Sequence, residues 1–228
     1  LAGSTGAWQE QLPYYQIPSS QVTPIEFKGI VLNAGVDSVS AMFKATYEGI
    51  YDGMSNPVIL ASGESDTLTC TSTLTPPETN AIHTIDYSVE VTGDEEDADS
   101  VNNVVESYTF EVNDFIYSRD MGVIDGGSFN QGDGFEVGNI FDIYADAMIY
   151  GVDVTVSQTA VEGAEVFVKL YSIDAETGDF IFITESDILP LDAPDLGNTK
   201  SFVLQSPSLL TAGEPYLIVA ATYGDGGV

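Results

Sequence analysis

Residues 93–120 read GDEEDADSVNNVVESYTFEVNDFIYSRD and decide how the rest of the sequence is divided. Their first part, 93–103, is an acidic loop that is too highly charged to be buried. It leads into 104–112, where apolar and polar residues alternate as they do in a half-buried strand. The polar turn at 113–120 follows, before new hydrophobic segments begin. This order predicts that one β-domain ends near Asp114 and that a second one begins there.

The composition indicates two folded domains rather than a disordered acidic tail. The chain has 228 residues, of which 43% are hydrophobic and 11% are aromatic. Disordered chains lack this apolar content, and about 100 residues are enough for a sandwich with its own core. We therefore expect an all-β chain of two tandem antiparallel β-sandwiches, with an extended lead-in at 1–21 and domains at 22–114 and 115–228.

The charge balance excludes some classes of partner. Five Lys and Arg residues stand against 36 Asp and Glu residues, for a formal net charge of -31. Such a field repels phosphate backbones and anionic lipid, which argues against nucleic acid and membrane surfaces as partners. Cations are its natural partners, so salt or bound divalent ions should raise stability.

Cysteine usage and hydropathy place the chain outside the membrane. Cys70 is the only cysteine, so no intrachain disulfide can form. It shares a strand face with Leu68, which predicts a small buried hydrophobic residue rather than a reactive thiol. No apolar run reaches the length of about 18 residues that a membrane span needs, and 1–20 lack a signal-peptide pattern. We expect a mature or internal piece of an extracellular or cell-surface protein, with more chain before Leu1 and after Val228.

Alternation with period two predicts the strands of the first domain. It is clearest at 39–47, where apolar residues alternate with Ser, Lys and Thr. The spacing of these strands, near ten residues, indicates an immunoglobulin-like sandwich. The expected strands lie at 22–31, 39–47, 58–60, 66–72, 84–91 and 104–112, with a loop at 51–57.

The lead-in carries three aromatic residues, Trp8, Tyr14 and Tyr15, and has no usable period. We expect them to anchor an extended segment across the first domain. A sugar-stacking platform is the alternative, because aromatic faces suit the apolar surfaces of sugar rings.

The layout of the first domain carries a resemblance to a known family. An apolar strand ends in Asn33-Ala34-Gly35, the turn 61–65 precedes a Thr-rich strand, and Asn102-Asn103 precede the last strand. In this order, residues 22–113 resemble the bacterial cell-adhesion-related domains called CARDB. The resemblance implies an extracellular, non-catalytic, immunoglobulin-like spacer or adhesive module.

The second domain begins with a loop rich in glycine and acids at 125–134. Two apolar segments flank Asp174–Asp179, which predicts a hairpin with a glycine-assisted loop. The strands as a whole indicate a jelly-roll-like antiparallel sandwich. They are expected at 139–147, 148–157, 164–173, 180–183, 201–205 and 215–223.

Three segments of this second domain carry another resemblance. Ser118-Arg119-Asp120, FDIYADA at 141–147 and VFVKLY at 166–171 are similar to β-sandwich modules of large secreted Bacteroidota proteins. Those modules stand ahead of a sorting domain, so the resemblance implies export by the type IX route.

No catalytic constellation is evident. His83 is the only histidine, and any nucleophilic triad would have to use it. Its position predicts a strand-end residue packed under a loop. One Cys and one His exclude the usual zinc sites. The 36 acids allow chance carboxylate pairs, so geometry must decide on glycoside hydrolysis. We expect no enzyme.

Calcium is the cofactor that the sequence favours, since Ca²⁺ takes about six to eight oxygen ligands. Neither candidate loop has EF-hand spacing, and solvated acidic loops of a salt-adapted protein are the alternative. The first predicted site comprises Asp94, Asp97, Asp99, Asn102 and Asn103, and the second comprises Asp125, Asn130 and Asp133.

These features predict a pair of adhesion or spacer modules from a large secreted or surface-anchored bacterial protein. Their partners would be a surface protein or a glycan, and other domains of the same longer chain. One alternative is carbohydrate binding by the second domain, for which an exposed row of Tyr or Trp on one sheet face would be the sign. Another is an accessory role beside a protease or glycosidase domain that lies outside this sequence.

Overall fold

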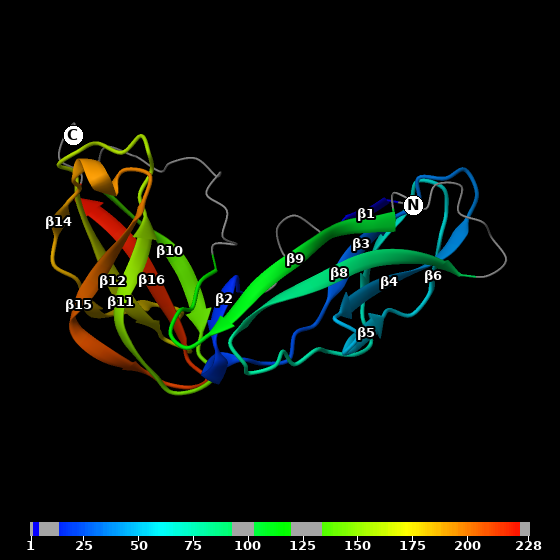
Figure 1. Cartoon of the computed structure of the whole chain (residues 1–228), viewed down its shortest axis with the longest axis horizontal. Helices are drawn as coiled ribbons and strands as arrows, with labels where there is room; N and C mark the ends of the chain where they lie inside the picture. The colour runs from blue at the N-terminus through cyan, green and yellow to red at the C-terminus, as the bar shows by residue number, and fades with distance from the viewer. Residues whose placement is uncertain (1, 5–13, 93–102, 120–133, 224–228) are drawn as a thin grey trace. The chain divides into compact units, whose positions relative to one another are not determined.

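A computed structural model describes residues 2–4, 14–92, 103–119 and 134–223 (Figure 1). The chain divides into two compact units, Leu1–Met121 and Gly122–Val228. The described residues form strands and short 3₁₀ turns, without an α-helix, so the all-β prediction is confirmed. None of the helical segments among these residues could cross a membrane.

The first unit is a sandwich of two sheets. A six-stranded sheet has the order β2-β9-β8-β4-β5, with β6 also paired to β4, and a three-stranded sheet has the order β1-β3-β7. Apolar side chains of both sheets fill the space between them. The strands are β1 (Ala2–Ser4), β2 (Gln16–Pro18), β3 (Lys28–Leu32), β4 (Val39–Tyr47), β5 (Tyr51–Met54), β6 (Val58–Leu60), β7 (Ser65–Thr69), β8 (Ala81–Thr92) and β9 (Val104–Asn113).

Strand β4 shows why this sequence buries one face of the large sheet. Ala41, Phe43 and Ala45 are buried, whereas the residues between them are partly exposed. Phe43 stacks on Tyr87 of β8 at 5.8 Å. It also occupies the space beside Gly29, where a Cβ atom would lie 2.5 Å from the Phe43 ring. Glycine at this position therefore lets the two sheets approach each other.

Two features of the first unit differ from the expected pattern. Strand β5 lies within the segment 51–57, which we expected to be a loop, because Tyr51 turns inward and packs against Phe27 at 5.5 Å. Strand β2 pairs with β9 in parallel, with Ile17 opposite Val112. All other strand pairs among the described residues are antiparallel.

The second unit also has two sheets. The larger has the order β10-β16-β12-β13, with β14 paired to β12, and the smaller pairs β11 with β15. Val168 of the larger sheet packs with Phe202 and Leu204 of the smaller one in a buried cluster. The strands are β10 (Gly134–Asp142), β11 (Ala147–Thr155), β12 (Glu165–Ile173), β13 (Phe180–Glu185), β14 (Leu189–Pro190), β15 (Thr199–Leu210) and β16 (Pro215–Tyr223).

The predicted hairpin between β12 and β13 is confirmed, with Ile173 opposite Phe180. Its loop is held by Asp174, whose carboxylate accepts hydrogen bonds from the main-chain N–H groups of Glu176 and Thr177 at 2.9 and 2.8 Å. These bonds hold the pKa of Asp174 below its ordinary value. Gly178 takes a positive φ of 76°, which is unfavourable for residues that have a Cβ atom.

Candidate functional site

Strand β12 has side chains of functional interest on the face that points away from the sandwich core. Val168 belongs to the buried cluster between the two sheets. Because successive strand residues point to opposite faces, Phe167, Lys169 and Tyr171 lie on the other side of the sheet. This side of β12 therefore carries two aromatic rings with a lysine between them.

Strand pairing brings further residues to the same side. Phe167 lies opposite Ala221 of β16, and Ala221 lies opposite Glu136 of β10. On the other flank, Tyr171 lies opposite Phe182 of β13. Residues directly opposite in a sheet share a face. Lys169 likewise lies opposite Glu185 of β13. We call this surface the aromatic face and define it as Glu136, Phe167, Lys169, Tyr171, Phe180, Phe182, Glu185 and Tyr223.

A polar network stands at the centre of the aromatic face. The Lys169 ammonium lies 2.5 Å from Glu136 Oε1, and the Tyr171 hydroxyl donates to Glu136 Oε2 at 2.9 Å. Burial opposes ionisation of Glu136, but the hydrogen bonds from Lys169 and Tyr171 outweigh it and lower the pKa of the carboxyl. The hydrogen bond to Glu136 also raises the pKa of Lys169. Both groups are charged at neutral pH, so the pair has no net charge.

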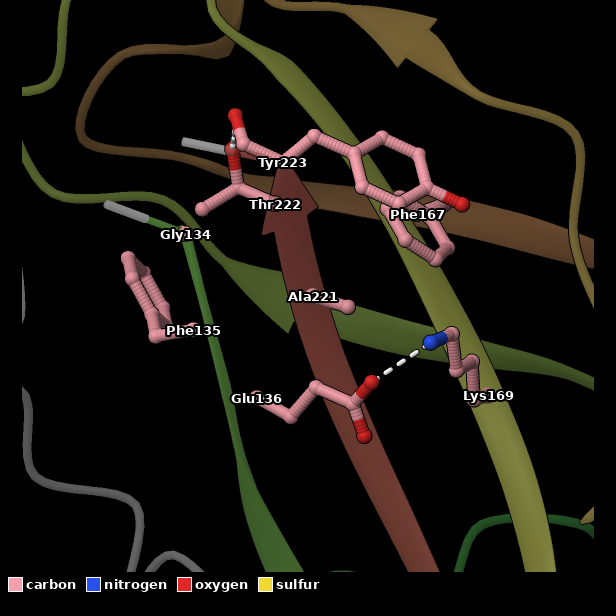
Figure 2. A pocket seen from close by; sticks show the side chains of 8 residues that line it. All are labelled: Gly134, Phe135, Glu136, Phe167, Lys169, Ala221, Thr222 and Tyr223. Atoms are coloured by element: carbon pink, nitrogen blue, oxygen red, sulfur yellow. Dashed lines mark hydrogen bonds and ion pairs between the residues drawn. The ribbon is translucent and has the colours of Figure 1, made fainter. Parts of the chain in front are cut away.

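Beside this network stands a backed aromatic platform (Figure 2). The Tyr223 ring stacks on Phe167 at 4.7 Å with an interplanar angle of 28°. The Lys169 ammonium lies 5.2 Å from the centroid of the Phe167 ring. Phe167 is only 1% exposed, whereas Tyr223 is 55% exposed. Tyr223 is therefore supported from behind and open to solvent.

The aromatic face continues onto β13. The Tyr171 ring meets Phe182 edge to face at 5.9 Å and lies 6.4 Å from Phe180. Phe180 is 56% exposed and Phe182 is 52% exposed. Exposed apolar groups gathered beside polar ones are typical of interaction surfaces.

An open hollow of about 400 Å³ lies at one end of the aromatic face, where β10 and β16 meet (Figure 2). Glu136 is the single acid among the residues that line it, and its charge is already paired with Lys169. Most glycosidases use two carboxyl groups, and this lining supplies one. The hollow is lined by Gly134, Phe135, Glu136, Phe167, Lys169, Ala221, Thr222 and Tyr223.

His83 and Cys70 lie in the core of the first unit. His83 is 2% exposed, its Nδ1 lies 2.6 Å from the Tyr47 hydroxyl, and its ring lies 5.1 Å from that of Phe110. Burial lowers the pKa of His83 and raises that of the Cys70 thiol. Cys70 is 5% exposed, which confirms that it packs as a buried hydrophobic residue.

The predicted calcium ligands lie almost entirely outside the described residues. This holds for four ligands of the first site and for the whole second site, so both sites remain predictions. Asn103 is described and is buried immediately before β9. Within the described parts of the chain, no three His, Cys, Asp or Glu side chains gather closely enough to hold a metal ion. The undescribed ligands are Asp94, Asp97, Asp99, Asn102, Asp125, Asn130 and Asp133.

The aromatic residues of the lead-in do not form a described platform. Tyr14 is 1% exposed and packs edge to face against Phe110 at 5.5 Å, so its ring is not open to a sugar. The stacking role predicted for Tyr14 is therefore wrong, because pairing of the neighbouring β2 with β9 draws this residue into the core. Tyr15 is half-buried. Trp8 lies outside the described residues.

No family model and no curated protein matches this sequence. Among solved structures, the chain is similar to a two-domain protein of unknown function from Bacteroides fragilis NCTC 9343. The alignment has 10% identity and a TM-score of 0.26, and it covers 97% of this chain and 94% of the other. A score of this size supports no argument about function.

Proposed function

We propose that this chain is a pair of non-catalytic β-sandwich modules in a larger secreted or cell-surface bacterial protein, and that the second unit adheres through its aromatic face. The observation that carries the proposal is the exposure of Phe180, Phe182 and Tyr223 around the paired charges of Glu136 and Lys169. Aromatic residues are enriched at binding surfaces because they bury much area with few rotatable bonds.

Three further considerations support an adhesive rather than an enzymatic role. The one histidine is packed in the core of the first unit, away from solvent. The resemblance to CARDB domains and to modules exported by the type IX route implies an extracellular setting. The outward face of the large sheet of the first unit carries mainly Ser, Thr, Lys and acidic residues, with Ile59 and Ile82 as exposed exceptions, and such a face suits a spacer that holds other domains apart. Calcium in the predicted acidic loops would stabilise it.

The test uses fluorescent beads that carry the full chain and flow over surfaces coated with polysaccharide or with protein. We expect beads with the wild-type chain to be retained and beads with the double variant Tyr223→Ala, Phe182→Ala to be lost. The control is Tyr150→Ala on β11, because Tyr150 is also exposed, at 64%, but lies outside the aromatic face. Equal retention of the double variant would contradict the proposal, as would turnover of a glycan or peptide substrate.

A further inference from the structure

The strongest unassigned feature of the molecule is the open side of the Tyr223 ring. One side of this ring is covered by Phe167 at 4.7 Å, and the residue is still 55% exposed. The covered side fixes the ring, so little side-chain freedom is lost when a ligand binds. A pyranose ring has an apolar face of comparable size that can stack on such a platform.

Hydrogen-bonding capacity lies directly beside this platform (Figure 2). The Glu136 carboxylate offers about four acceptor sites, and Lys169 and Tyr171 use one oxygen each. The Lys169 ammonium has three donors, of which one points to Glu136. The remaining sites can accept from and donate to hydroxyl groups at the same time. Sugar hydroxyls act in both roles.

The charge of the site favours a neutral ligand. Glu136 and Lys169 cancel each other, whereas Glu185, opposite Lys169 on β13, is a further acidic residue of this face without a salt bridge among the described residues, and the chain as a whole carries a formal charge of -31. An anionic polysaccharide would be repelled by that field. A cationic ligand would find many acidic surfaces on this chain, with no reason to select the aromatic face.

The ion pair also argues against a protein partner. A dry protein interface would remove water from Glu136 and Lys169, and desolvation of two charges is costly unless new hydrogen bonds replace the water. The centres of protein interfaces are accordingly depleted of charged residues, Lys and Glu among them. Hydroxyl groups of a sugar can take the place of the lost water molecules on both ions.

From these observations we infer that the aromatic face binds a neutral glycan, with one pyranose ring on Tyr223 and its hydroxyl groups on Glu136 and Lys169. This inference rests on the proposed function and specifies its ligand. The hollow is open, so it suits one or two rings of a longer polymer rather than an enclosed small molecule. Phe180 and Phe182 would contact neighbouring rings of the same polymer.

The experiment is a glycan array probed with the full chain, followed by titration calorimetry with laminarin, xyloglucan, galactomannan and the anionic polymer alginate. We expect binding to at least one neutral glycan and not to alginate. Loss of one stacking ring should weaken that binding about tenfold in Tyr223→Ala, whereas Tyr223→Phe keeps the ring and most of the affinity. Tyr150→Ala should bind as the wild type does, and an unchanged melting temperature shows that each variant is folded.

The outcomes separate this inference from the proposed function. Suppose that bead retention needs Tyr223 but the chain binds no glycan, or binds alginate best. The neutral-glycan ligand would then be overturned, and adhesion through the aromatic face would stand. Retention of beads on protein alone would have the same meaning. Bead retention that does not need the aromatic face would overturn the proposed function itself. Neutral-glycan binding that Tyr223→Ala leaves unchanged would overturn the assigned site.

Discussion

The larger sheets of the two units each carry a lysine on the outward face, and the surroundings of the two lysines differ. Lys44 on β4 lies 3.2 Å from both Asp52 and Glu90, on a face that also carries Thr46, Ser88 and Met54. Lys169 on β12 is paired with Glu136 and lies 5.2 Å from the centroid of the Phe167 ring.

The two units share the way in which their sheets pack and differ in the residues on their outward faces. In both units, alternation puts apolar side chains between two sheets and leaves the other face to the remaining positions. The first unit fills most of those positions with Ser, Thr, Lys and acids, which water solvates well, although Ile59 and Ile82 are also exposed there. The second fills them with rings that water solvates poorly, so this face gains more from a ligand.

The largest expected effect concerns the buried cores, because each unit packs apolar side chains between two sheets. Phe43→Ala and Phe202→Ala each remove a buried ring from between two sheets, where Phe43 is 2% and Phe202 is 0% exposed. Each should lower the free energy of unfolding of its own unit by about 3–5 kcal/mol, measured by urea unfolding with one probe per unit. Tyr150→Ala on the surface is the control. If either variant lost less than about 1 kcal/mol of unfolding free energy, the two cores would not be built alike.

Calcium gives the next largest effect and distinguishes the loops of the two units. If the loop at 93–103 binds Ca²⁺, a concentration 100 times the Kd should stabilise the first unit by about 2.7 kcal/mol. The measurement compares melting in calcium and in chelator at constant ionic strength, with Mg²⁺ as the control for unspecific charge relief. The double variant Asp97→Asn, Asp99→Asn should lose the shift. An unchanged melting temperature in calcium would remove the first site.

Much of this architecture follows from local pattern. The alternation at 39–47 predicts β4 with its observed ends, and the short apolar run at 58–60 predicts β6. The strand expected at 139–147 instead occupies 134–142, because glycines made its first half resemble a loop. Gly138 is required there, since a Cβ atom would lie 1.8 Å from the Ile218 carbonyl oxygen of β16.

The candidate site was harder to predict for a physical reason. The segment VFVKLY at 166–171 is apolar in both phases of the alternation, and so is FIFI at 180–183. A strand that buries one face needs apolar residues in one phase only. The additional apolar residues in the other phase were therefore the sequence signal for an apolar outward surface. Glu136 could not be located in the same way. Its place beside Lys169 depends on β10 and β12 flanking β16, and pattern alone does not determine such a strand order.

A pH titration sharpens the contrast between the two units, because the one histidine lies in the first. Burial holds the pKa of His83 below its ordinary value, so the folded state disfavours its protonated form. The stability linked to His83 is therefore complete above the ordinary pKa, near 6.5, and is lost as the pH falls through and below that value. We expect acidification from pH 7.5 to 5.5 to destabilise the first unit more than the second, and His83→Gln to flatten the dependence.

Nuclear magnetic resonance offers a direct check on the same prediction. With a single histidine in the chain, the ring resonances of His83 need no assignment. Their titration midpoint should lie below that of a model peptide. A midpoint equal to the peptide value or above it would show that the ring is solvated, and the buried contact with Tyr47 would then be wrong.

The smallest effect returns to the two lysines. Lys44→Met and Lys169→Met keep the aliphatic stem and remove the charge. The Lys44 ammonium donates a hydrogen bond to Glu90 and forms an ion pair with Asp52, and such surface pairs contribute at most about 1 kcal/mol to stability. Lys169 also lies 5.2 Å from the Phe167 ring, and a contact of this kind adds about 0.5–1 kcal/mol.

Lys169→Met should therefore lower the free energy of unfolding more than Lys44→Met does, by urea titration at low salt. In 1 M NaCl, both losses should shrink because salt screens exposed pairs, and the contact with Phe167 should make the residual loss larger for Lys169. A greater cost for Lys44→Met would mean that a second carboxylate matters more than an aromatic neighbour. The aromatic neighbour of Lys169 would then add no stability to its ion pair. The rigidity of the Tyr223 ring would have to come from its stacking on Phe167 alone.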